Sequence, residues 1–161
     1  MTTTEPNVMA QVEAHIAQYL RTVLVDEDDV ALIPVREGQT TEEYALPFVA
    51  VVATSAQEIA TDPGVSWWEI TVRVSVLTSL FVSVADSEDG SDLDPDAATN
   101  HAAISGIVAA ELIDYAPGTV ITDFPAAIFG WHPESSEEAQ NEKMFMAVRQ
   151  FKAFAAPVYP E

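Results

Sequence analysis

The sequence contains no cysteine, few basic residues and no long hydrophobic run, and each absence narrows what the protein can do. Without cysteine, disulfides, thiolate nucleophiles, iron–sulfur clusters and cysteine zinc sites are all excluded. No apolar run approaches the roughly 20 residues that span a membrane. The segment from Met1 to Pro6 lacks the basic and apolar regions of a secretion signal. We therefore expect a soluble protein with no membrane partner.

Acidic residues far outnumber basic ones. Only 6 Lys and Arg residues stand against 26 Asp and Glu, which gives a formal net charge of −20. Such a chain is repelled by nucleic-acid phosphates and by anionic membranes, so direct binding to either is not expected. Binding of a basic partner, binding of divalent cations or adaptation to a salt-rich medium would each account for this charge. An equal alternative is that the charge serves only to keep the protein in solution.

The residue types that commonly carry catalysis form no familiar motif. The three histidines (His15, His101 and His132) belong to no His-x-x-x-His or His-Glu-x-x-His pair, and they are expected at the surface or at an interface. The serines lack both the Gly-x-Ser-x-Gly and the Ser-x-x-Lys arrangement. The glycines form no phosphate-binding loop. The sequence therefore predicts no catalytic residue, no metal site and no cofactor, and we expect that the protein is not an enzyme.

One segment, residues 85–96, is an acidic loop. Six carboxylates fall within the eleven residues from Asp86 to Asp96, which invites a calcium interpretation. With Gly90 in the sixth position of an EF-hand loop, however, Ala85 would occupy the first position, where Asp is required. We expect a solvated loop that is mobile in the isolated subunit and unnecessary for folding, with a cation site as the alternative.

Hydrophobic periodicity predicts two helices, because apolar residues recur every three or four positions in residues 7–25 and 97–115. The acidic run Asp26 to Asp29 ends the first helix, since carboxylates at a helix C-terminus oppose its dipole. Strands are predicted at 47–53, 67–78, 126–132 and 143–155, with a further short strand at 30–35. The polar segment 133–142 is expected to link the last two strands.

The alternation in residues 67–78 sets the register of that strand. Trp68 joins Ile70 and Val72 on the core side, so Trp67 faces the other way. The strand should pair antiparallel with residues 47–53 through a connection longer than a tight hairpin. Together these elements predict one α/β (α+β) domain over residues 1–161, with a mainly antiparallel sheet of four to five strands and two packed helices.

The last predicted strand carries apolar residues on both faces, which is typical of a buried strand or of one whose outer face meets another subunit. Trp67 is either a local packing cap or an interface anchor. The candidate interface residues are two aromatic anchors (Trp67 and Phe151), three basic residues (Arg73, Arg149 and Lys152) and three acidic residues (Glu134, Glu137 and Glu138). We expect the basic residues of one copy to face the acidic residues of the next.

The order of elements resembles a known family. An amphipathic N-terminal helix, a Pro-Phe-Val-Ala-Val-Val strand, an aromatic-led alternating strand, an acidic loop, a helix rich in Ala and Ile and two late strands follow one another over nearly the whole chain. This order resembles the tail terminator, or tail-completion, proteins of long-tailed viruses. The resemblance implies a small α/β protein that caps the tail tube as a ring and presents a docking face to head-completion proteins.

Further expectations follow from the resemblance. The partners would be other copies of the chain in a ring, with six as the expected number, together with tail-tube protein and a neck or head-completion protein. DNA would only pass through the channel, and the protein would reside in the virion tail or neck after assembly in the host cytoplasm. The acidity would reflect a salt-adapted host or the passage of DNA.

Two other classes remain open. A neck or head-closure (head–tail joining) protein would resemble a tail terminator in its size, in its pattern of hydrophobic and polar residues and in its assembly as a ring. An acidic DNA-mimic inhibitor is suggested by the charge alone, although mimics usually spread carboxylates along helices and this chain concentrates them in loops.

Overall fold

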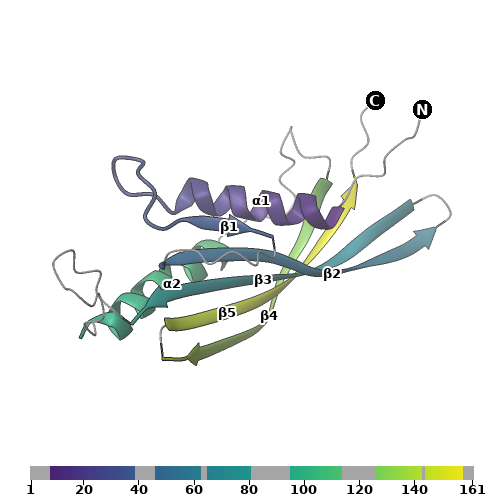
Figure 1. Ribbon diagram of the computed structural model, residues 1–161. Coiled ribbons are helices and arrows are strands. Elements are labelled where there is room, and N and C mark those ends of the chain that lie inside the picture. Colours follow the sequence, from purple (N-terminus) through teal and green to yellow (C-terminus); the bar gives the residue numbers. More distant parts are fainter. Residues whose placement is uncertain are drawn as a thin grey trace.

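A computed structural model describes residues 8–38, 46–62, 65–80, 95–113, 126–142 and 144–157. The elements, in chain order, are α1 (Val8–Val23), β1 (Val35–Glu37), β2 (Phe48–Asp62), β3 (Val65–Ser79), α2 (Ala97–Ile113), β4 (Ala126–Gln140) and β5 (Met144–Pro157) (Figure 1). The two predicted helices are confirmed, each with ends within two residues of those expected. Residues 81–94, which hold most of the predicted acidic loop, lie outside the described residues. Neither α1 nor α2 is long and apolar enough to cross a membrane.

The five strands form one sheet in the order β1-β2-β3-β5-β4. Every neighbouring pair is antiparallel except β1 and β2, which run parallel over Val35–Glu37 and Val49–Val51. The predicted α+β class and the mainly antiparallel sheet are therefore confirmed.

Both helices pack on the same face of this sheet. Along β3 the residues Ile70, Val72, Val74 and Val76 are buried on that face, as the alternation predicts. They meet the buried stripe of α1, which includes Val12, Ile16 and Leu20. Trp68 packs partly buried against the same core. Strand alternation then places Trp67 on the opposite face, which we call the open face.

β2 and β3 are longer than predicted and form an extended hairpin. β2 continues to Asp62 and β3 begins at Val65, so the connection is shorter than expected. The hairpin projects past α1 on the right of Figure 1. Where β1 ends, Glu13 of α1 accepts a hydrogen bond from the Ala53 N–H at 2.8 Å. Burial raises the pKa of Glu13, and the hydrogen bond from Ala53 opposes that shift.

The predicted strand at residues 30–35 is wrong. Instead, Asp26 accepts hydrogen bonds from the N–H groups of Asp28 and Val30 at 2.8 and 3.0 Å, and Asp29 has a positive φ of 60°. These contacts fold the acidic run into a tight turn, and the strand begins only at Val35. An Asp side chain that bonds to backbone two residues ahead favours a turn over a strand.

The prediction that residues 133–142 form a linker is also wrong. β4 continues through Gln140, and each of its residues from Ser135 to Gln140 pairs with β5. Most of these side chains are exposed. The segment is a strand because its backbone bonds to β5, although its composition resembles a loop.

Candidate interaction surface

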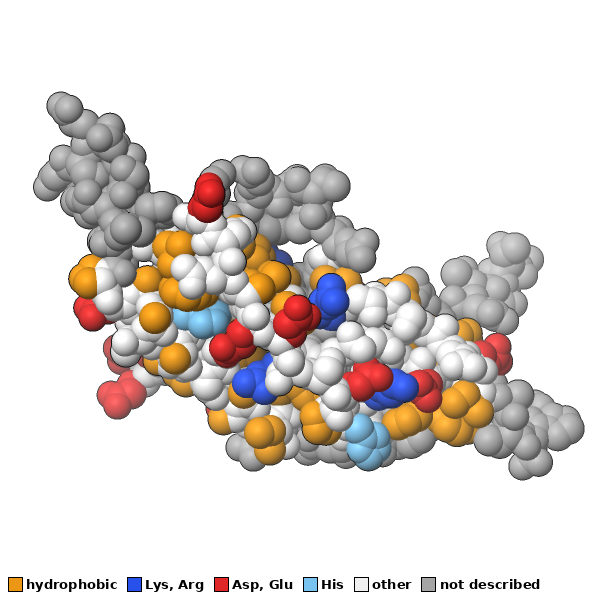
Figure 2. Space-filling model, turned by 90° about the horizontal axis from the view of Figure 1, so that it is seen from below, with side chains coloured by type: hydrophobic (Ala, Val, Ile, Leu, Met, Phe, Trp, Pro, Cys, Tyr) orange, Lys and Arg blue, Asp and Glu red, His pale blue; other side chains and the backbone are white. Residues whose placement is uncertain are grey.

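The open face of the sheet is a surface that no described element covers. It carries alternate residues of β2, β3, β5 and β4, which lie in rows across the sheet. Figure 2 views the molecule from the side away from α1, where charged side chains of both signs lie among hydrophobic ones. The face divides along the strands into an aromatic end, a polar belt and an aliphatic end.

The aromatic end is centred on Phe154 of β5. Trp67 meets Phe154 edge to face, with ring centroids 5.5 Å apart and an interplanar angle of 62°. His132 of β4 meets the same ring at 5.7 Å and 71°. Edge-to-face contacts of this kind add to the stability of an aromatic cluster beyond simple burial. The cluster therefore fixes the orientation of Trp67 on an otherwise uncovered face.

The polar belt is built around Lys152. Its ammonium lies 3.0 Å from a Glu69 carboxylate oxygen and 3.6 Å from one of Glu134, and Gln150 donates a hydrogen bond to Glu134. The hydrogen bond to Glu69 and the two negative charges raise the pKa of Lys152 above its ordinary value. Arg73 is exposed in the next row and forms no ion pair with any residue in the described ranges.

The aliphatic end lies toward the opposite ends of the strands. Phe48, Leu77 and Met146 share one row, and Ala50, Ser75 and Val148 share the next. All of these side chains are half-buried in the isolated chain. On β4 the second of these rows ends at Glu137, which pairs with Val148, so the surface is uncharged over β2, β3 and β5 and acidic at its β4 edge.

The structure divides the eight predicted interface residues between the two faces. Five lie on the open face: Trp67, Arg73, Glu134, Glu137 and Lys152. The other three, Glu138, Arg149 and Phe151, lie on the face that the helices cover. Phe151 is only 4% exposed and stacks on Trp131 with centroids 4.5 Å apart, so it packs inside the subunit and is not a surface anchor. Lys152 already pairs with carboxylates of its own chain.

A second surface that no described element covers is the outer side of α2, which was not predicted from the sequence. None of its exposed positions is charged: Ala98, Thr99, Asn100, Ala102, Ala103, Gly106, Ile107, Ala110 and Ile113. Ile107 and Ile113 are 45% and 77% exposed. Leu32, 53% exposed, borders the same small apolar recess as Ile107. A helix with apolar residues on every side is usually covered. The scarcity of charge in this helix, whose one acidic residue is Glu111, was therefore the signal that the sequence offered.

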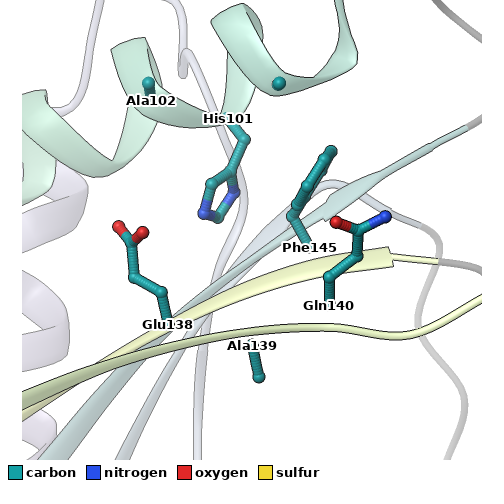
Figure 3. Close-up of a pocket in the computed structure, with 7 residues that line it drawn as sticks. His101, Ala102, Glu138, Ala139, Gln140 and Phe145 are labelled. Carbon is teal, nitrogen blue, oxygen red and sulfur yellow. The ribbon is translucent and has the colours of Figure 1, made fainter.

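A cavity of about 310 Å³ lies between α2 and the paired ends of β4 and β5. Its walls include His101 of α2, Glu138 and Gln140 of β4, and Phe145 of β5 (Figure 3). His101 is 6% exposed, its Nδ1 lies 2.8 Å from the Thr78 hydroxyl, and its ring stacks on Phe145 with centroids 5.3 Å apart.

The environment of His101 differs from the expected surface position. Burial lowers the pKa of His101 below its ordinary value, and the negative charge of Glu138 partly offsets that effect. His15 of α1 is buried as well, and burial lowers its pKa. The histidines were expected at the surface or at an interface. His15 and His101 are instead buried inside the subunit, whereas His132 is exposed. Within the described ranges, no group of three or more His, Asp or Glu residues could hold a metal ion.

No protein-family model and no curated protein match this sequence. Among solved structures, one similar chain belongs to the "Virion of native gene transfer agent (GTA) particle". The match has 14% sequence identity and a TM-score of 0.48, and covers 92% of this chain and 90% of that chain. Similarity at this level assigns neither a family nor a function. The resemblance to tail terminator proteins stays a prediction.

Proposed function

We propose that this protein is a structural component of a virion, which caps the tail tube as a ring and connects it to the head, and that it has no catalytic activity. The observation that carries this proposal is the presence of two different uncovered surfaces on one subunit. The open face of the sheet is one, and the uncharged outer side of α2 with Leu32 is the other. The order of helices and strands, which resembles that of tail terminators, supports the same proposal.

Two different surfaces favour head-to-tail association. When one patch binds another patch on an identical neighbour, the chain of contacts closes into a ring if the rotation fits. Copies that each carry a formal net charge of −20 repel one another. Contacts are therefore favoured where acidic residues are few, and the outer side of α2 meets this condition.

The aromatic end of the open face supplies an anchor for this contact. Trp67 is half-buried and held by Phe154, so an incoming surface would find a rigid aromatic ring rather than a mobile one. Tryptophan residues of this kind often carry a large share of binding energy. Arg73, exposed in the neighbouring belt, would add electrostatic attraction to carboxylates that border the uncharged α2 surface of the next copy.

A head-to-tail interface can be tested by mixing two variants. Trp67→Ser should disable one patch, and Ile107→Glu should disable the other, so each variant alone should be monomeric by native mass spectrometry. An equimolar mixture should form a one-to-one dimer that grows no further, because each variant keeps the patch that the other lacks. Thr22→Glu, on the exposed side of α1, adds the same charge elsewhere and should still assemble.

The capping role requires a second assay. Purified protein should stop elongation of tail-tube protein at substoichiometric amounts, whereas a neck or head-closure protein should bind head-completion protein and leave tube growth unchanged. A chain that stays monomeric with both partners present would contradict the proposal. So would turnover of a substrate that a single carboxylate or histidine substitution abolishes.

A further inference from the structure

The cavity beside His101 adjoins the outer side of α2, because Ala98 and Ala102 belong to both, but its other walls come from His101, β4 and β5. Figure 3 shows Glu138 and Gln140 rising from β4 toward α2, while Ala139 points the other way. One ring nitrogen of His101 faces the side of the cavity where Glu138 lies, and the other bonds to Thr78. Glu138 lies on one side of the cavity, below Ala102, and Gln140 lies on the other side, beside Phe145 (Figure 3). The cavity therefore has one polar side chain from β4 on each side, with apolar groups next to it.

The charge on this cavity is negative and unbalanced. Glu138 forms no ion pair with another residue of the described ranges. Arg149, on the neighbouring strand, borders the same shallow recess as Glu138 yet lies beyond ion-pair distance. An anion would be repelled here, and a wholly apolar group would strip water from Glu138 without replacing its hydrogen bonds. A cationic group bearing N–H donors satisfies the Glu138 carboxylate.

The backbone next to the cavity is also available for binding. β4 is the last strand of the sheet, and no described strand pairs with its outer edge. Its pairing with β5 over Ser135 to Gln140 has no shift in register. The outer edge of this segment therefore offers backbone N–H and C=O groups at the regular spacing of a strand, as a further strand would need. Partner segments commonly bind by adding a strand to such an edge, while side-chain pockets next to it select the sequence.

We propose that the outer edge of β4 and the cavity together bind an extended segment of a partner protein, one of whose Lys or Arg side chains enters the cavity. The charged end bonds to Glu138, and the aliphatic stem lies along Ala98, Ala102 and Phe145. A volume of about 310 Å³ is at the small end for ligand pockets, which suits one long side chain better than a cofactor. This inference does not depend on the proposed function.

A short peptide tests the charge requirement. The probe is the blocked pentapeptide acetyl-Val-Thr-Arg-Thr-Val-amide carrying a fluorophore, and its Kd for the full chain is measured by fluorescence anisotropy. Replacing its arginine by citrulline keeps the shape and removes the charge, and should weaken binding at least about tenfold, which is about 1.4 kcal/mol. Methylation of alternate backbone nitrogens of the peptide should abolish binding, because it removes the donors that pair with a strand edge.

Neighbouring glutamates on β4 provide a matched pair of variants. Glu138→Gln removes the carboxylate in the cavity, whereas Glu137→Gln makes the same change in net charge on the open face. The first should weaken binding of the arginine peptide at least about tenfold, and the second should leave it within about twofold. Equal losses in the two variants, unchanged binding of the citrulline peptide, or no binding of the arginine peptide would each overturn the proposal.

Discussion

Trp131 of β4 donates a hydrogen bond from its indole Nε1 to the backbone carbonyl of Leu112 at 3.0 Å. Leu112 lies in the last turn of α2, where carbonyl groups have no partner within the helix. The indole ring also stacks on Phe151 of β5 with an interplanar angle of 13°. One side chain therefore joins the edge strand to both the helix and the core. The same three elements, α2, β4 and β5, supply the walls of the His101 cavity.

Replacing Trp131 by Phe should destabilise the fold. The substitution keeps an aromatic ring against Phe151 but leaves the Leu112 carbonyl without its donor in a buried position, which costs about 1–3 kcal/mol. Urea unfolding followed by circular dichroism would measure the change. Trp67→Phe is the control, because Trp67 lies on the open face, and it should lower the free energy of unfolding by less than about 1 kcal/mol. Equal losses for the two variants would contradict the role assigned to Trp131.

Two glycines should respond in opposite ways to alanine. A Cβ built on Gly106, in the middle of α2, meets no atom within 4 Å. Gly106→Ala should therefore raise the free energy of unfolding by about 0.5–1 kcal/mol, as alanine does in an open helix position. A Cβ on Gly130 would lie 2.8 Å from Cδ2 of Phe154. Gly130→Ala should destabilise the chain and disturb the Trp67–Phe154 contact, and a stabilising effect there would contradict the packing described for the aromatic end.

The sequence predicted the elements whose side-chain pattern matches their period. β3 alternates strictly from Trp68 to Val76, and α1 repeats every three or four residues, so both elements and their buried faces were predictable. β4 was not, because an edge strand with exposed side chains shows no alternation of hydrophobicity. Its conformation depends on backbone pairing with β5, which composition does not reveal.

The candidate surfaces were predictable only in part. Alternation alone placed Trp67 on the outer face of β3. The same rule places Glu137 and Glu138 on opposite faces of the sheet, but it applies only once β4 is known to be a strand. The burial of Phe151 depends on Trp131, and the cavity depends on Thr78, His101 and Phe145, which come from separate segments. A local sequence pattern does not predict contacts between segments that lie far apart in the sequence.

The buried histidines should make stability depend on pH. The pKa values of His15 and His101 are lowered from 6.5 by burial, so between the lowered values and 6.5 the folded chain binds fewer protons than the unfolded chain. Stability from these groups is therefore present above pH 6.5 and is lost as the pH falls through that range. Ring proton resonances followed by NMR should titrate below 6.5 for both residues.

The same titration tests the link between His101 and Glu138. The charge of Glu138 raises the pKa of His101 against the larger effect of burial. Glu138→Gln should therefore lower the midpoint of His101 further and leave that of His15 unchanged. Glu137→Gln, which alters the opposite face of β4, should shift neither residue. A His101 midpoint that responds equally to both variants would mean that Glu138 acts only through net charge.

Charges on the open face should affect association between copies more than folding. Arg73 is exposed and forms no ion pair with the described residues, whereas Lys152 is held by Glu69 and Glu134 of its own chain. If the open face binds a neighbouring copy, Arg73→Gln should weaken association severalfold at low salt, because the attraction to carboxylates of the neighbour is lost. The difference between Arg73→Gln and the unmodified chain should shrink as salt approaches about 1 M, where screening shortens the range of charge interactions to about 3 Å. Sedimentation velocity over a salt series measures both effects. Arg21→Gln is the control for loss of a positive charge away from the open face, since Arg21 lies on α1, where it pairs with Glu37 at 3.2 Å. Identical salt series for Arg73→Gln and the unmodified chain would exclude Arg73 from the interface and leave Trp67 as its remaining predicted anchor.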